Sequence, residues 1–138
     1  SQPTPQVGLP QPYSGPRSKL EAFEYWMGPY PFYEDGFKVV EAPHLGMEHQ
    51  SAIAYGNGFE NGYLGGDISQ SGWGMKWDFI LVHESAHEWF GNNITTADVA
   101  DMWVHEAFTS YAETLYTEYF QPLARAWFYC SALLPTMY

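Results

Sequence analysis

Apolar residues recur at helical spacing near the start of the chain, where Leu20, Phe23 and Met27 lie three and four residues apart. Ser18, with Glu21 three residues later, forms a capping-box pattern at the beginning of this segment. A Gly-Pro pair directly after Met27 would end a helix there. The pattern therefore predicts a first helix that starts close to Ser18.

The stretch before this helix has a different character. Four prolines precede Pro16 and no hydrophobic period is present, which predicts an extended arm over residues 1–18. Of the whole chain, 46% is hydrophobic and 19% aromatic, which argues against disorder beyond the arm. We expect residues 19–138 to form one domain that buries a core without disulfide support.

The middle of the chain favours strands and a loop. Residues 37–42 and 51–55 are short and rich in β-formers, so they predict two strands joined by the segment around Met47 and Glu48. Residues 56–75 contain seven glycines, which predicts a long ordered loop.

The second half of the chain predicts helices. One helix is predicted over residues 77–90, with Gly91 as its C-terminal cap. A second is predicted over residues 98–120, where it stops before Pro122, and another over residues 123–133. A small sheet followed by helices is an α+β arrangement.

Charge and cysteine content exclude several classes of function. The formal net charge of −11 argues against a nucleic-acid partner, which requires a basic face, and would favour amine-bearing ligands. Cys130 is the single cysteine, so no internal disulfide forms and a thiolate metal site is excluded. The apolar run 79–82 is too short to span a membrane, and no stretch of this sequence predicts a signal peptide. We expect a soluble protein whose compartment the sequence leaves open.

The candidate chemistry lies in the HESAH segment, residues 83–87. On a helix, His83 and His87 lie one turn apart on the same face and can bind one ion, with Glu106 as a third ligand. Three ligands leave a fourth tetrahedral position for water, which is typical of catalytic rather than structural zinc. Glu84 is then placed to act as general base. The alternative is a pair of helical histidines that only pack or face solvent.

Neighbouring motifs extend this pattern. His87 is followed by Glu88 and the sequence WFGN, and eighteen residues separate His87 from Glu106. Upstream, residues 45–49 read LGMEH and residues 26–32 read WMGPYPF. Together these segments resemble the gluzincin metallopeptidases of the aminopeptidase N family, in which they correspond to HExxH, the glutamate ligand, GAMEN and FGxYP.

The resemblance implies a thermolysin-like zincin catalytic domain with one Zn²⁺ per chain, bound by His83, His87 and Glu106. The implied reaction is hydrolysis of the amino-terminal peptide bond of a peptide with a free N-terminus. Glu48 would bind the substrate's α-ammonium group, and the backbone at Gly46 and Met47 would run beside the substrate, where a glycine permits close approach.

The chain also departs from the family pattern. Leu45, Gly46 and His49 replace the Gly, Ala and Asn of GAMEN, and His105 replaces an Asn before the glutamate ligand. The family carries this unit within a longer chain and places a transition-state tyrosine further downstream than Tyr138. We therefore expect a fragment or shortened form, which further domains or chains could complete.

Three alternatives stay open beside the aminopeptidase: a zinc endopeptidase, a different zinc hydrolase, and a zinc-loaded module without turnover. Among residues around the ligands, Glu113 lies two helical turns after Glu106 and is either a hydrogen-bond partner of a ligand or a solvated residue. His105 either lines the site or packs elsewhere, and Glu88 is interpreted as structural.

Overall fold

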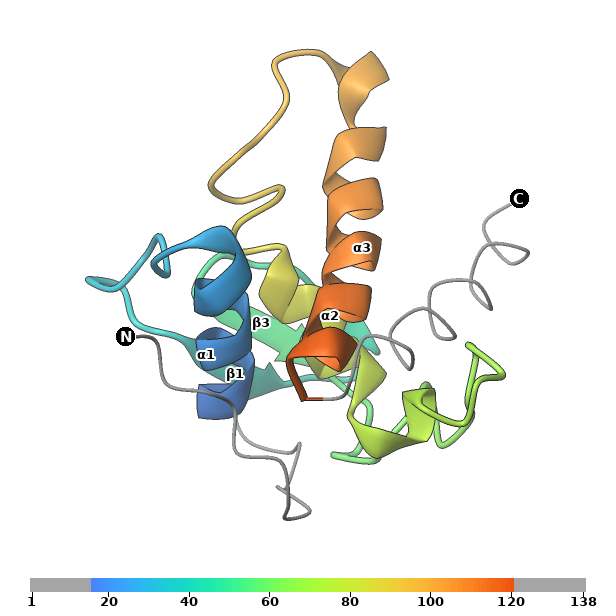
Figure 1. Cartoon of the computed structure of the whole chain (residues 1–138). Helices are drawn as coiled ribbons and strands as arrows, with labels where there is room; N and C mark the ends of the chain where they lie inside the picture. The colour runs from blue at the N-terminus through green and yellow to red at the C-terminus, as the bar shows by residue number, and fades with distance from the viewer. Residues whose placement is uncertain (1–15, 121–138) are drawn as a thin grey trace, which may run out of the picture.

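The computed structural model describes residues 16–120, and its elements are shown in Figure 1. Three α-helices and three short strands account for its regular structure, together with two 3₁₀ turns. In chain order these are α1 (Pro16–Met27), β1 (Lys38–Glu41), β2 (Gly46–Met47), β3 (Ala52–Tyr55), η1 (Gly74–Lys76), α2 (Phe79–Ala86), η2 (Val99–Asp101) and α3 (Trp103–Phe120).

The strands form one small mixed sheet in the order β1-β3-β2. β1 pairs in parallel with β3, from Lys38 opposite Ala52 to Glu41 opposite Tyr55. β2 pairs antiparallel with β3, and this third strand was not predicted. The α+β class is confirmed, and the segment expected only to join two strands is itself an edge strand of the sheet.

Helix α2 lies at the centre of the fold. It packs against α3 and α1 on one side and against β2 and β3 on the other. Val82 and Ala86 belong to the larger core with α1 and α3, whereas Ile80 and Leu81 pack against Tyr55 of β3. A helix that is apolar on most of its surface is buried from several sides, so α2 is held firmly in place.

The starts of all three described helices differ from the predictions, and α2 begins at Phe79 rather than at residue 77. Helix α1 begins at Pro16, so Ser18 lies inside the helix rather than at its cap. Proline is favoured in the first turn, where its missing N–H costs nothing. Helix α3 begins at Trp103 rather than Asp98, because Asp98 caps the 3₁₀ turn η2 instead.

The end of α2 also differs. Asp78 caps its start by accepting a hydrogen bond from the Leu81 N–H at 3.1 Å. The α-helix then stops at Ala86, and residues 87–89 form turns rather than continuing to residue 90. His87 keeps helical dihedrals (φ −62°, ψ −19°), so the one-turn spacing to His83 survives. Gly91, expected as a cap, has a φ of +117°, which favours glycine.

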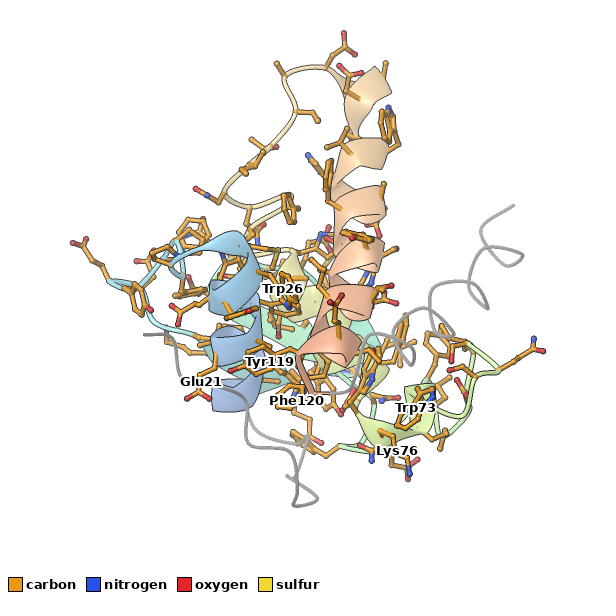
Figure 2. The ribbon with its side chains drawn as sticks, in the orientation of Figure 1. Glu21, Trp26, Trp73, Lys76, Tyr119 and Phe120 are labelled. Carbon is orange, nitrogen blue, oxygen red and sulfur yellow. The ribbon has the colours of Figure 1, made fainter. Side chains whose placement is uncertain are left out.

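Aromatic contacts join the helices at the lower end of α3. Tyr119 of α3 lies 5.4 Å from Tyr25 of α1 between ring centroids, and Figure 2 shows Tyr119 and Phe120 at this end. The predicted glycine-rich loop is confirmed and leads into η1, where Trp73 and Lys76 lie on the other side of the molecule from α1 (Figure 2).

The predicted helix 123–133, Cys130 and Tyr138 lie outside the described residues. Within residues 16–120, no helix combines the length and apolar character that a membrane span requires.

Candidate metal centre

Helices α2 and α3 bring the three predicted ligands together. The Nε2 atom of His83 lies 3.3 Å from Glu106 Oε2, and Nε2 of His87 lies 3.4 Å from Glu106 Oε1. One ligand atom from each residue falls within 4.8 Å of the others, so the group could hold a metal ion. The side chain of Glu106 is 62% exposed, whereas those of His83 and His87 are 17% and 1% exposed, so solvent reaches the centre from the side of α3.

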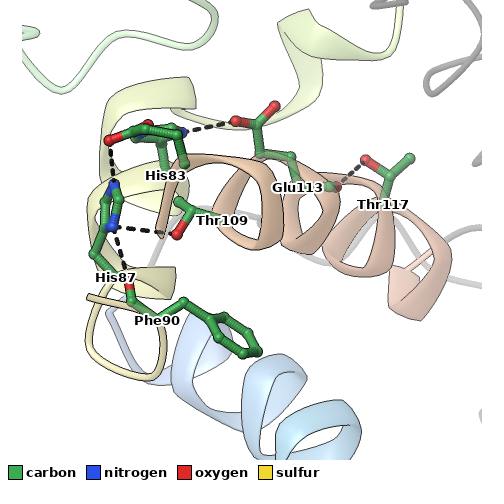
Figure 3. Close-up of polar contacts among 7 residues, drawn as sticks. His83, His87, Phe90, Thr109, Glu113 and Thr117 are labelled. Carbon is green, nitrogen blue, oxygen red and sulfur yellow. Dashed lines mark hydrogen bonds and ion pairs between the residues drawn. The ribbon is translucent and has the colours of Figure 1, made fainter. Parts of the chain in front are cut away.

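Each histidine has a partner for its other ring nitrogen, as Figure 3 shows. Nδ1 of His83 lies 2.8 Å from Glu113 Oε1, and Nδ1 of His87 lies 2.9 Å from the Phe90 carbonyl oxygen. Thr109 Oγ1 also contacts His87 Nδ1 at 3.2 Å. Because a carbonyl oxygen only accepts, His87 carries its proton on Nδ1 and presents an Nε2 lone pair to the centre.

The distances fit a tetrahedral ion. Ligand atoms held 2.0–2.2 Å from one centre at tetrahedral angles lie about 3.3–3.6 Å from one another. Each imidazole nitrogen lies at such a distance from Glu106, that of His83 at 3.3 Å from Oε2 and that of His87 at 3.4 Å from Oε1. The carboxylate on His83 and the carbonyl on His87 are partners that typically orient histidine ligands.

Charge at the centre also favours a cation. Burial lowers the pKa of His83, but its bonds to Glu106 and Glu113 outweigh burial and raise that pKa to about 10. Burial lowers the pKa of His87, which faces a carbonyl group rather than a second carboxylate. The bond to His83 lowers the pKa of Glu106. The carboxylates thus supply more negative charge than the imidazoles offset, which a divalent cation would neutralise.

Glu84 lies beside the ligands and is 7% exposed. Burial raises its pKa to about 7; His83 opposes this rise, and the charges of Glu48 and Glu106 add to it. A carboxyl group with a pKa near neutrality is suited to general acid–base chemistry.

The edge strand β2 passes directly over this carboxyl group. A Cβ atom at Gly46 would lie 2.4 Å from Glu84 Oε1 and 2.6 Å from Ile80 Cγ2. Only a glycine therefore lets β2 approach α2 without moving Glu84 or Ile80.

Glu48 also reaches the centre, from the turn that follows β2. Its carboxylate lies within 4.8 Å of ligand atoms of Glu84 and His87. Met47, the preceding residue, is 36% exposed. The structure thus brings the three predicted ligands together with Glu84, Glu48 and Gly46.

The surrounding residues resolve the open alternatives. Glu113 contacts a ligand, and its 2% exposure excludes the solvated alternative. His105 does not face the centre: its Nε2 accepts a hydrogen bond from the Thr96 N–H at 3.1 Å and so ties the preceding loop to α3. Thr109 was not singled out, although its position three residues after Glu106 places both on one helix face.

The profile of the "Peptidase family M1 domain" matches residues 20–136. The chain belongs to peptidase family M1. This confirms the resemblance that the HExxH, GAMEN-like and FGxYP-like segments indicated. No solved structure gives a significant match to this M1 chain.

Curated M1 relatives match over a shorter segment. The chain is 46% identical to Aminopeptidase N of Mus musculus and 44% identical to that of Homo sapiens, in each case over 43 residues. It is 47% identical over 47 residues to Aminopeptidase Q of Acinonyx jubatus. These segments cover 31–34% of this chain but only 4–5% of the relatives, so the chain spans a small part of the length of the proteins it matches.

Proposed function

We propose that this chain carries the zinc centre of an aminopeptidase, in a thermolysin-like catalytic domain formed by residues 19–138. The observation that carries this proposal is the convergence of both Nε2 atoms on the Glu106 carboxylate, at 3.3 Å from Oε2 and 3.4 Å from Oε1. His83, His87 and Glu106 would hold one Zn²⁺ per chain. When bound, zinc supplies Lewis-acid polarisation of the scissile carbonyl and acidifies water.

The remaining steps fall to the residues around the ligands. Glu84, with its raised pKa, takes a proton from the attacking water and returns it to the leaving amine. Glu48 binds the substrate's α-ammonium group, which places the first peptide bond at the centre. The backbone of Gly46 and Met47 runs beside the substrate, and the missing Cβ at Gly46 lets this strand lie against Glu84 without displacing it.

Completion of the site by further polypeptide is part of this proposal. The N-terminal half of α3 exposes apolar side chains close to Glu106, and Trp103 is 64% and Tyr111 54% exposed. A patch of this kind on a peptidase unit is suited to contact with another domain or chain. The second candidate function is a module that binds zinc but does not turn over substrate unless another domain or chain contacts this patch.

The first test is hydrolysis of alanyl 4-nitroanilide by the whole chain. We expect turnover that a chelator abolishes and that added zinc restores. Stoichiometric zinc without turnover would instead support the inert module. Equal cleavage of internal and terminal peptide bonds would support an endopeptidase.

The second test examines Glu48 as the amine anchor, the residue that binds the substrate's α-ammonium group. A charge-assisted contact to an ammonium group contributes roughly ten- to a hundred-fold to affinity. Glu48→Ala should therefore weaken cleavage of free-amine substrates by about that factor, with zinc content unchanged. N-acetylation of the substrate should slow the parent protein strongly and the variant much less. If the parent cleaves both substrates equally well, Glu48 is not an amine anchor.

A further inference from the structure

Glu88 is a buried carboxylate that the proposed reaction does not use. Its side chain has no exposed surface. Oε2 accepts a hydrogen bond from the Tyr30 hydroxyl at 2.6 Å, and Oε1 accepts from the Ser51 N–H at 2.9 Å and from Asn92 Nδ2 at 3.3 Å. A buried charge with three donors is well satisfied and holds those donors in fixed positions.

Both donors to Oε1 lead to the turn between β2 and β3, which carries Glu48. Ser51 closes this turn just before β3. The amide of Asn92 donates to the Glu48 carbonyl oxygen at 2.8 Å as well as to Glu88. The turn is thus tied at both ends to the segment that follows α2, at Glu48 through Asn92 and at Ser51 through Glu88.

Asn92 is also bonded to a proposed zinc ligand. Its backbone N–H donates to the His87 carbonyl oxygen at 3.0 Å, while its side chain holds Glu48. One residue therefore bridges His87 and the backbone of Glu48. The bridge thus links the Glu48 main chain directly to the main chain of His87.

The turn has few internal bonds that would fix it alone. The N–H of His49 donates to the Met47 carbonyl at 2.9 Å, and that of Ala52 to the His49 carbonyl at 3.1 Å. Ser51 adopts φ +60°, a left-handed conformation that residues other than glycine rarely take. Such a conformation persists only where surrounding contacts hold it, and the bond to Glu88 is one such contact.

We infer that Asn92 and Glu88 are positioning residues that set the register between Glu48 and the metal centre, and thereby the preference for substrates with a free amino terminus. This inference rests on the proposed role of Glu48. It predicts that breaking the bridge lowers selectivity for the free amine without lowering zinc binding or hydrolysis as such.

The test compares Asn92→Ala with Gln50→Ala in the zinc-loaded whole chain. Gln50 lies in the same turn, but its amide donates to Asp35 at 3.1 Å in an exposed position, so it is the matched control. The first readout is kcat/KM for alanyl 4-nitroanilide divided by that for its N-acetyl form. The second is the affinity for leucinamide against N-acetyl-leucinamide by NMR titration, which needs no turnover.

For Asn92→Ala we expect the free-amine preference to fall roughly three- to tenfold, the effect of losing the hydrogen bond that its side chain donates to the Glu48 carbonyl. The loss should appear in KM, with the acetylated substrate and the zinc content unchanged. Gln50→Ala should match the parent. In a Glu48→Ala background, Asn92→Ala should change nothing further, because the anchor is already gone.

Three more variants keep the test decisive if Asn92→Ala fails to fold. Asn92→Asp has the same shape, but it cannot donate to the Glu48 carbonyl and places a carboxylate beside Glu88, so it should lose the preference too. Glu88→Gln should retain it and Glu88→Ala should lose it. Gln keeps an acceptor for Ser51, and Tyr30 can turn its hydroxyl to the Gly36 carbonyl at 3.2 Å.

Two results would overturn the inference and leave the aminopeptidase proposal intact. One is that Asn92→Ala lowers kcat/KM equally for the free and the acetylated substrate. The other is that Asn92→Ala still lowers kcat/KM in the Glu48→Ala background. A parent protein that binds and cleaves both forms equally would instead overturn the role of Glu48 and the inference together.

Discussion

The two sides of the candidate site are built in different ways. On the metal side, His83, His87, Glu106 and Glu113 all come from α2, its last turn and α3, two helices packed against each other. On the amine side, Glu48 comes from a turn between two short strands, and its main-chain contact comes from Asn92, 44 residues away. Helix spacing and the packing of α2 on α3 fix the metal side, whereas a few long-range hydrogen bonds fix the amine side. Substitutions should therefore separate metal binding from substrate selection.

The largest effect should follow from removing a ligand on the metal side. We expect one zinc per chain at about 2.0–2.2 Å from its ligands, and His83→Ala or His87→Ala should empty the site and abolish hydrolysis. His44→Ala, a histidine outside the proposed centre, is the control. Metal analysis of the purified proteins is the measurement, and full zinc content in either ligand variant would contradict the assignment.

Replacing the general base should leave the metal in place. Glu84→Gln keeps the size of the side chain but removes the proton acceptor, so turnover should fall by about 10²–10⁴-fold with zinc retained. Steady-state kinetics together with metal analysis would check this. Near-normal turnover would mean that another residue activates the water.

The same contrast explains what the sequence could predict. The four-residue spacing of His83 and His87 and the seven-residue spacing of Glu106 and Glu113 are helical, so their placement on shared faces could be predicted. The strand at Gly46–Met47 could not, because two residues carry no period and their pairing depends on β3. The early stop of α2 was missed because the apolar pattern runs past Ala86.

Glu88 illustrates the limit most clearly. It was interpreted as structural from its position alone, but its three donors come from Tyr30, Ser51 and Asn92, of which only Asn92 is close in sequence. A buried carboxylate network depends on tertiary approach, which neither spacing nor composition records. In the sequence, the one indication that Glu88 is buried is its position directly before Trp89 and Phe90.

Replacing Glu113, the partner of His83, should lower zinc affinity less than removing a ligand does. Glu113→Gln removes the charge that faces His83 Nδ1 at 2.8 Å, and such partners typically contribute ten- to a hundred-fold to metal affinity. Zinc affinity from competition with a chelator should fall by about that factor. Glu118→Gln, five residues later on α3, is the control. If both variants bind zinc equally, the carboxylate does not tune the ligand.

The smallest effect concerns stability at the start of α2 and should leave both sides of the site intact. Lys19 of α1 is fully buried near Asp78, which caps α2. Burial lowers the pKa of Lys19 to about 8, and the charge of Asp78 opposes this shift. Because the folded-state pKa lies below the ordinary value, the stability contribution is fully present above pH 10.5 and is lost as the pH falls through about 8.

The free energy of unfolding of the parent relative to Lys19→Met should accordingly rise between about pH 8 and pH 10. The raised pKa of His83 changes stability with pH in the opposite direction. Because both proteins contain His83, its contribution cancels when the two free energies of unfolding are subtracted. Urea unfolding at several pH values is the measurement, with zinc content and free-amine preference followed in parallel. A difference that stays flat across this range would mean that Lys19 titrates as in the unfolded chain. A change in amine preference alone would mean that the start of α2 and the Glu48 turn are coupled, against the separation of the two sides.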